Sequence, residues 1–409
     1  CIASATTAQF FSKSSANFGS LINSLCNPFK VASSIKHFLG YQVPVSGKDR
    51  TPAIISDQAL REYHLPAFKA AIDAGAGTVM ISFNDINGVP ATANKWLVTD
   101  VLRNQWGFKG MVVTDYTGIN ELTAHGLGDL QQVSALALNA GVDMDMVGEG
   151  FLTTLKKSLD EGKVSIADID RACRYILEAK YKLGLFDDPY RYSDQKRADK
   201  ALNNPENRKA ALEVAKKSIV LLKNEKQTLP ISKNTKTIAF IGPMVKEYKE
   251  NMGFWSVELP EVDYNKFIVS QWDGMQNKVG KNTKLLYAKG CEVDGDNKDG
   301  FAEAVATAQQ ADVVILSIGE RRDMSGEAKS RSDLHLPGVQ EDLIKELQKT
   351  GKPIVILINA GRPLIFNWIA DNMPTIVYTW WLGSEAGNAI ADVLFGDYNP
   401  AGRLPVTYY

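Results

Sequence analysis

The chain has few cysteines, no long apolar segment and no excess of charge of either sign. Its four cysteines are scattered through 409 residues, and none forms a CxxC pair or stands at zinc-finger spacing from a histidine, so neither a structural zinc site nor a disulfide scaffold is expected. The longest apolar runs, 313–318 and 353–360, are far shorter than the roughly 20 residues that span a bilayer. The 46 Lys plus Arg nearly balance the 47 Asp plus Glu, which argues against a nucleic-acid partner.

From residue 31 onward, short apolar segments alternate with amphipathic helical patterns. Short apolar runs predict buried parallel strands at 78–82, 111–115 and 142–146. The sequence around them predicts helices at 57–74, 95–106 and 131–140, and further helices between 149 and 184. The alternation of strand and helix predicts an α/β fold, in which helices cover a parallel sheet.

The same pattern resumes in the second half of the chain. Residues 187–209 are polar, rich in turn-forming residues and include Pro189, which predicts a linker. Beyond them, apolar runs predict strands at 218–222, 237–241, 313–318, 354–358 and 375–379. We therefore expect an unassigned segment at 1–30, a first domain at 31–186 and a second α/β domain at 210–409.

Several chemically competent residues stand at the ends of the first domain's predicted strands. Asp115 ends one run, Lys36 and His37 end another, and Met80 and Phe83 lie at the end of a third. Ligands of parallel α/β sheets bind beyond the carboxyl ends of the strands, so these side chains are candidates for one site. The alternative for Asp115 is an N-cap of the following helix, a position that Asp favours.

Several long motifs carry a family resemblance. They are K-H-F at 36–38, the run 76–116 ending in M-V-V-T-D-Y, I-G-P at 241–243, G-F-W-S at 253–256, S-G-E-A-K-S-R-S-D-L-H-L-P-G-V-Q at 325–340 and the closing run 381–409. In this order they resemble glycoside hydrolase family 3, specifically its bacterial periplasmic β-glucosidase branch. The resemblance implies a TIM-like (β/α)8 barrel followed by an α/β sandwich. It also implies an exo-acting retaining β-glycosidase of the β-glucosidase or β-xylosidase type, periplasmic or secreted, that needs neither cofactor nor metal.

In that family the position of Asp115 is the nucleophile that forms a glycosyl-enzyme ester. Lys36 and His37 resemble the pair that hydrogen-bonds the sugar, and the cation of Lys36 would help to keep the nucleophile charged. Tyr116 stands where relatives often carry Trp. The loop at 39–50 contains no histidine, which disfavours the His-Asp mechanism of the family's β-N-acetylglucosaminidases.

The general acid/base of a retaining enzyme lies roughly 5 Å from the nucleophile. Relatives of this branch supply it from the second domain, in a loop similar to S-G-E-A-K-S-R here, which points to Glu327. Glu320, at the end of the preceding strand, is the rival, and a solvated run of charges is the alternative for the first half of the loop. Arg331 would orient Glu327 or a substrate hydroxyl.

The first domain is short for the implied barrel. A complete barrel takes about 250 residues, whereas about 185 precede the linker, so the N-terminal half of the barrel is expected to be missing. Three explanations would each account for this: a fragment whose remainder lies outside this sequence or on a separate polypeptide, a homo-oligomer, or a homologue that binds carbohydrate without cleaving it. Residues 37–57 also differ from the loop expected of a β-glucosidase, so the sequence does not determine which sugar is preferred.

Overall fold

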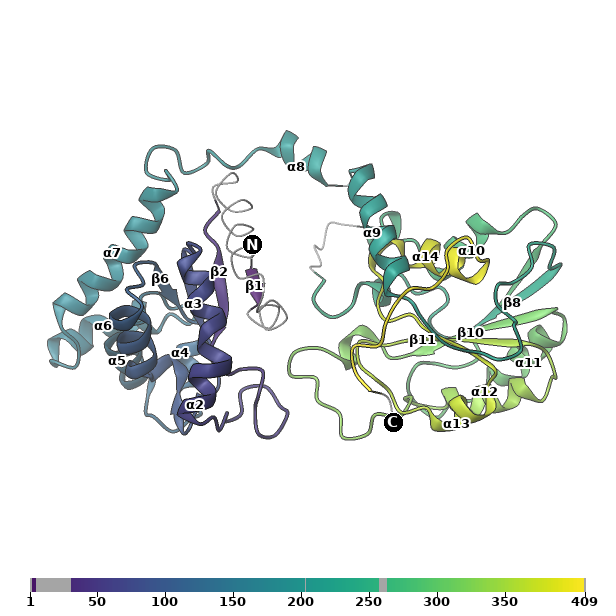
Figure 1. The fold of residues 1–409 in the computed structure, drawn as a ribbon, viewed down its shortest axis with the longest axis horizontal. Helices are drawn as coiled ribbons and strands as arrows, with labels where there is room; N and C mark the ends of the chain where they lie inside the picture. The colour runs from purple at the N-terminus through teal and green to yellow at the C-terminus, as the bar shows by residue number, and fades with distance from the viewer. Residues whose placement is uncertain (1, 5–30, 203, 257–262, 408–409) are drawn as a thin grey trace. The chain divides into compact units, whose positions relative to one another are not determined.

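The computed structural model describes residues 2–4, 31–202, 204–256 and 263–407. It divides into two compact units, Cys1–Asp194 (unit 1) and Gln195–Tyr409 (unit 2), each shown in Figure 1. The boundary between the units falls within the 187–209 segment, which is not wholly irregular because it contains helix α8 (Gln195–Ala201). Of the unassigned segment 1–30, only β1 (Ile2–Ser4) lies within the described residues.

Unit 1 is built on a sheet of four parallel strands in the order β1-β2-β3-β6. The strands after β1 are β2 (Ser34–Phe38), β3 (Thr78–Ile81) and β6 (Met111–Val113). All four residues of β3 are buried, as expected for a central parallel strand covered on both faces. The predicted strands at 78–82 and 111–115 are therefore confirmed, each with a shorter carboxyl end.

The strand predicted at 142–146 is wrong. This segment meets β6 only through an isolated bridge between Val113 and Met144. The carboxylate of Asp143 accepts the amide of Val112 at 2.8 Å, and that of Asp145 accepts the amide of Gly150 at 2.7 Å. The carboxylate of Asp143 thus takes the Val112 amide of β6, and the carboxylate of Asp145 binds the start of α6, so the segment makes only one bridge to β6.

The helices predicted in unit 1 are present, with some in wide-turn form. The segment 57–74 forms α2 (Asp57–Ala59), the π-helix η2 (Leu60–His64) and α3 (Leu65–Asp73), and 95–106 forms the π-helix η4 (Trp96–Gln105). The other elements are β4 (Asp85–Ile86), β5 (Val89–Pro90), η3 (Ala91–Ala93), α4 (Gly118–Glu121), α5 (Leu130–Ala140), α6 (Gly150–Asp160) and α7 (Ile166–Lys182).

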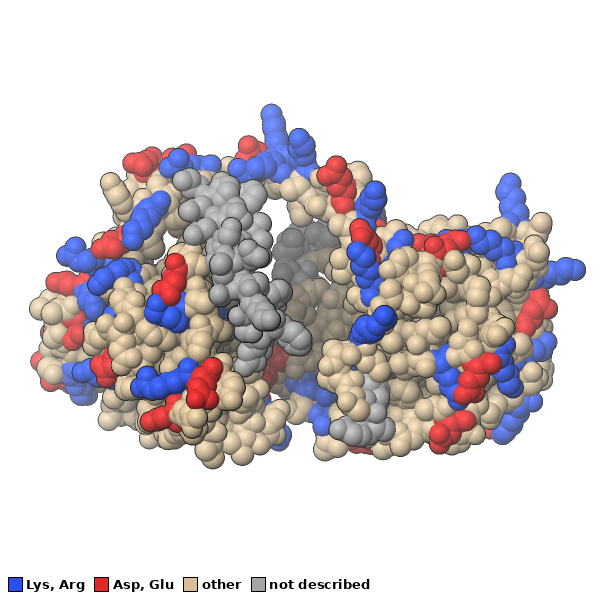
Figure 2. All heavy atoms as spheres, viewed as in Figure 1, with Lys and Arg blue, Asp and Glu red and all other residues tan. Residues whose placement is uncertain are grey.

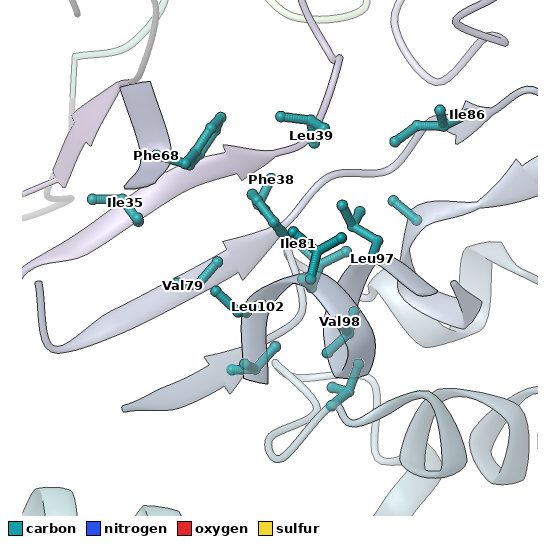
Figure 3. Packing of buried hydrophobic residues seen from close by; sticks show 14 of the residues in the cluster. Ile35, Phe38, Leu39, Phe68, Val79, Ile81, Ile86, Leu97, Val98 and Leu102 are labelled. Carbon is teal, nitrogen blue, oxygen red and sulfur yellow. The ribbon is translucent and has the colours of Figure 1, made fainter. Parts of the chain in front are cut away.

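The core of unit 1 lies between the sheet and these helices, as Figure 3 shows. Phe38 of β2 packs edge-on against Phe68 of α3, with ring centroids 5.0 Å apart. Leu97 and Leu102 of η4 are fully buried in the same cluster. Each such side chain contributes about 1.5–3 kcal/mol by leaving water, and together they fix the strand that carries Lys36 and His37.

Unit 2 contains a six-stranded sheet in the order β7-β12-β11-β10-β8-β9. Its strands are β7 (Val220–Asn224), β8 (Thr237–Ile241), β9 (Lys284–Ala288), β10 (Val313–Gly319), β11 (Ile354–Asn359) and β12 (Thr375–Tyr378). The five predicted strands are confirmed, although β7 starts two residues later than predicted and runs antiparallel to β12. Sequence reasoning missed β9, an edge strand that begins at the exposed Lys284 and is only partly buried.

Helices cover both faces of this sheet. In β10 the buried residues alternate, with Val314 and Leu316 in one core cluster and Val313 and Ile315 in the other, as the two-residue period of a strand requires. Figure 1 shows the helices on the two sides: α9 (Pro205–Ser218), α10 (Gln271–Lys278), α11 (Phe301–Gln309), α12 (Gln340–Gln348), α13 (Asn367–Asn372) and α14 (Ala386–Leu394).

Charges of both signs are interspersed over the face of the molecule shown in Figure 2, where no extended basic area is visible. That distribution gives no electrostatic footprint for nucleic acid on this face. Among the helices of the described ranges, none combines the length and the apolar character needed to cross a bilayer.

Candidate active site

Asp115 and His37 meet at the carboxyl ends of two parallel strands, β2 and β6, that flank β3 in the sheet. His37 belongs to β2 and Asp115 lies two residues after β6, with Nε2 of His37 3.2 Å from Oδ2 of Asp115. In the pairing of β2 with β3, the register shifts between Ile35 and Phe38, so β2 has an extra residue at Lys36 and His37. Such a bulge re-aims side chains, and both residues are partly exposed although the strand is internal.

The chain turns sharply after Asp115. Oδ1 of Asp115 accepts the amide of Tyr116 at 2.8 Å, and Thr117 adopts a left-handed conformation with φ 55°. Thr117, not Asp115, is the N-cap residue of α4. The capping role considered for Asp115 is therefore not what the structure shows, and strained backbone of this kind is common at functional sites.

The surroundings of Asp115 favour its ionised form. Burial by itself raises the pKa of this carboxyl, but the His37 hydrogen bond, the Tyr116 amide and the positive charges of His37 and Lys36 lower it by more. The net result is a pKa of Asp115 below its ordinary value, so the carboxylate carries its charge throughout the neutral range. An ionised carboxylate beside an imidazole is suited to nucleophilic attack on an electrophilic carbon.

A series of contacts leads from His37 through two aromatic rings to an ion pair. The ring of Tyr41 lies 4.9 Å from that of His37 and 6.1 Å from that of Phe83. The guanidinium of Arg50 lies 4.3 Å from the centre of the Phe83 ring and donates to both carboxylate oxygens of Glu121. Sequence reasoning named Phe83 but missed the other three, whose only signal was proximity to the K-H-F strand or to Asp115.

The remaining predicted residues of unit 1 have different environments. Met80 is buried within β3, where it pairs with Val113 of β6, whereas the side chain of Tyr116 is 59% exposed. Met80 therefore lies inside the sheet, whereas Tyr116 lies on the surface of unit 1. Their roles in substrate binding stay predictions.

Unit 2 carries the other predicted group in the loop that follows β10. Glu327 is half-buried and stands between two unusual backbone positions, Gly326 with φ 152° and Ala328 with φ 58°. A side chain at Gly326 would meet the ring of Phe254, so only glycine fits there without displacing that ring.

Glu320, the rival of Glu327, is fully buried. Its carboxylate pairs with the guanidinium groups of Arg331 and Arg362. A buried carboxylate between two arginines has the environment of a structural counter-ion. Arg331, predicted to orient Glu327 or a substrate hydroxyl, is thus paired with Glu320, and it also donates to the carbonyl of His335.

In the part of the chain that the structure describes, no group of three or more His, Cys, Asp or Glu side chains is placed to hold a metal ion.

Two family descriptions match the sequence. Residues 11–179 match the glycosyl hydrolase family 3 N-terminal domain, and residues 219–409 match the glycosyl hydrolase family 3 C-terminal domain. Asp115, His37 and Lys36 fall in the first match and Glu327 in the second.

Individual relatives show the same similarity. The chain is 41% identical to the periplasmic β-glucosidase of Salmonella typhimurium, over 93% of this chain and 52% of that protein. It is 40% identical to a β-xylosidase of Formosa agariphila, over 92% of this chain and 54% of that protein. The structure is similar to that of a β-glucosidase from Listeria innocua in complex with isofagomine, with a TM-score of 0.83 and 32% identity, over 93% of this chain and 53% of that one.

The chain spans about half the length of the curated relatives that it matches. The structural similarity, the parallel sheet of unit 1 and the larger sheet of unit 2 together confirm the predicted fold class, a TIM-like domain followed by an α/β sandwich.

Proposed function

Because the chain belongs to glycosyl hydrolase family 3, we propose that it is an exo-acting retaining β-glycosidase of the β-glucosidase or β-xylosidase type. Such an enzyme removes the non-reducing-end sugar of a β-linked oligosaccharide in two steps. The observation that carries the proposal is the Asp115 carboxylate, kept ionised beside His37 at the carboxyl ends of parallel strands. One relative is named a β-glucosidase and another a β-xylosidase, so both sugars are candidates.

In the first step, Asp115 attacks the anomeric carbon while Glu327 donates a proton to the glycosidic oxygen. The C–O bond to the leaving group breaks, the aglycone departs as a neutral alcohol, and the sugar becomes an ester of Asp115. In the second step, the ionised Glu327 takes a proton from water, the water oxygen attacks the anomeric carbon, and Asp115 leaves as a carboxylate. The two inversions give net retention.

Substrate binding is assigned to the residues around the nucleophile. The amine of Lys36 and the imidazole of His37 would hold sugar hydroxyls, because both are carried to the rim of the sheet by the bulge in β2. Tyr116 and Phe83 would supply aromatic surface beside the sugar, and Met80 would support it from β3. Arg331 would help to hold the loop that carries Glu327, through its ion pair with Glu320.

The sheet of unit 1 has fewer strands, in the described residues, than a closed barrel. A closed barrel of this type has eight strands, and the described residues supply four. Large apolar side chains are also exposed on α6 and α7, namely Leu152 (81%), Ile166 (58%) and Tyr181 (76%), as is typical of surfaces that another element covers. We propose that further units complete the barrel, whether from the same polypeptide, a complementing polypeptide or a second copy.

The location of the protein and a second candidate function are proposed on separate grounds. A periplasmic or secreted location is proposed because the Salmonella relative is named periplasmic. The second candidate function is a homologue that binds carbohydrate without hydrolysing it, favoured by the four-stranded sheet. Light scattering after size-exclusion chromatography would show whether the chain forms a dimer that could complete the sheet.

The proposed reaction is tested by following hydrolysis of aryl β-glucosides and β-xylosides by proton NMR. The β-anomer of the free sugar should appear first and then equilibrate, since the mechanism retains configuration. Appearance of the α-anomer first would refute a retaining mechanism. Binding without turnover, on both sugars, would favour the non-catalytic candidate.

A further inference from the structure

Arg362 lies at the centre of a set of contacts that closes the loop carrying Glu327. It follows the carboxyl end of β11, and its guanidinium Nη2 donates to the backbone carbonyls of Met324 and Lys329, the latter at 2.7 Å. These two carbonyls lie on either side of Glu327 in the sequence. One guanidinium group therefore ties together the two ends of the short segment that includes Glu327.

The position of Arg362 is itself fixed by buried groups. Its Nε lies 3.4 Å from the carboxylate of Glu320, which is fully buried directly after β10. Its backbone carbonyl accepts the hydroxyl of the buried Tyr378, at the end of β12, at 2.5 Å. The anchor thus rests on the ends of three adjacent strands, β10, β11 and β12.

A second arginine holds the far side of the same loop. Arg331 pairs with the other oxygen of Glu320 and donates to the carbonyl of His335 at 3.2 Å. One buried carboxylate therefore binds two guanidinium groups, and both also bind loop carbonyls. Buried charges are costly unless they are paired in this way, so loss of either arginine would leave Glu320 poorly compensated.

The segment between the two carbonyls needs such restraint. Ala328 is held in a left-handed conformation that L-residues rarely adopt, and Gly326 lies against the ring of Phe254. Conformations of this kind persist only where the surrounding contacts impose them. Without the guanidinium of Arg362, the segment would relax and move the Glu327 carboxyl.

We propose that Arg362, with Glu320 as its buried counter-ion, is a positioning residue that sets the Glu327 carboxyl for proton transfer. This inference rests on the proposed function, in which Glu327 is the general acid/base. Lysine at position 362 can still pair with Glu320, but it is a single flexible ammonium group that cannot reproduce the planar fork of donors. Arg362→Lys therefore removes the geometry while keeping the charge.

The test compares phenyl and 2,4-dinitrophenyl β-glucosides, or the matching β-xylosides if these are better substrates. A dinitrophenolate leaves without a proton, whereas phenolate needs the general acid. In Arg362→Lys, kcat/KM should fall about 10- to 100-fold on the phenyl glycoside, because a displacement of about 1 Å has an effect of this order, and only a few-fold on the dinitrophenyl glycoside. Arg208→Lys is the matched control: Arg208 also pairs with a buried carboxylate of unit 2, that of Glu385, and should leave both values unchanged.

Glu327→Ala tests the acid/base role of Glu327 separately from the positioning role of Arg362. If it shows the same dependence on the leaving group, with azide restoring turnover of the dinitrophenyl substrate, Glu327 is the acid/base. An equal loss on both leaving groups in Arg362→Lys, or no loss, would then overturn the positioning role alone. Absence of the dependence in Glu327→Ala would overturn the acid/base assignment, and the inference with it.

A measurement without turnover keeps the inference testable in any case. Hydrogen exchange of peptides covering 321–335 should speed up in Arg362→Lys and not in Arg208→Lys, because the loop loses its contacts with the strand ends. Unchanged exchange in this loop would show that Arg362 does not hold it and would overturn the proposal.

Discussion

Asp143→Asn removes a buried negative charge directly behind the strand that leads to Asp115. Asp143 is 2% exposed, accepts the amide of Val112 at 2.8 Å and pairs with Arg103 at 2.5 Å. Burial raises the pKa of Asp143 from 3.8 to about 6, although the positive charge of Arg103 and the Val112 amide act in the opposite direction.

A raised pKa in the folded protein gives a defined dependence of stability on pH. Between pH 3.8 and about 6, the native state binds more protons than the unfolded state, so stability that is fully present below the unfolded pKa is lost as the pH rises through the folded one. The whole difference corresponds to about 3 kcal/mol, of which about 2 kcal/mol falls between pH 4.5 and 7.5. Asparagine does not titrate, so the free energy of unfolding of Asp143→Asn lacks this pH-dependent decrease, whether the variant is more or less stable than the wild type overall.

The assay is urea unfolding at pH 4.5 and 7.5, read on peptides of unit 1 by a short hydrogen-exchange pulse at one fixed pH. The free energy of unfolding of the wild type should fall by about 2 kcal/mol relative to Asp143→Asn over this interval. Asp73→Asn, a change at the surface of the same unit where the side chain is 59% exposed, should follow the wild type. Parallel pH dependences of the wild type and Asp143→Asn would refute the reasoning.

Three further predictions concern the site and its supports. His37→Ala removes the hydrogen bond that lowers the pKa of Asp115, so the acidic limb of the pH profile of kcat/KM should move to higher pH; an unmoved limb would contradict this. Leu97→Ala should lower the free energy of unfolding of unit 1 by about 2–5 kcal/mol in urea titrations, because Leu97 is fully buried, and a loss below 1 kcal/mol would count against the packing described. Gly326→Ala should lower kcat through the clash with Phe254, and normal turnover would show that the loop yields freely.

Much of the fold follows from local sequence signals. A central parallel strand is buried on both faces, as every residue of β3 is. Its sequence is therefore a continuous apolar run, and the run 78–82 could be predicted as such a strand. The edge strand β9 carries a weaker signal because only its last residue, Ala288, is buried. The sequence predicts a strand at 142–146, but the side-chain hydrogen bonds of Asp143 to Val112 and of Asp145 to Gly150 decide its path.

The site could be predicted only in part. Parallel strands end at the same edge of a sheet, so the placement of His37 and Asp115 at one edge could be predicted, whereas their contact across β3 could not. The approach of Arg50 to Glu121, 71 residues apart in the sequence, depends on loop paths that leave no periodic signal. The pairing of Glu320 with Arg362 is likewise a long-range contact between strand ends.

The central claim, that Asp115 is the nucleophile of a retaining β-glycosidase, is tested most directly by covalent labelling. The chain is mixed with 2-deoxy-2-fluoro-β-glucosyl fluoride or its xylosyl counterpart, and the intact mass and the labelled peptide are measured. We expect a mass increase of one fluorosugar on the peptide that contains Asp115, in the wild type and in Asp73→Asn but not in Asp115→Asn. A label on another carboxylate, or none in a folded and substrate-binding sample, would contradict the claim.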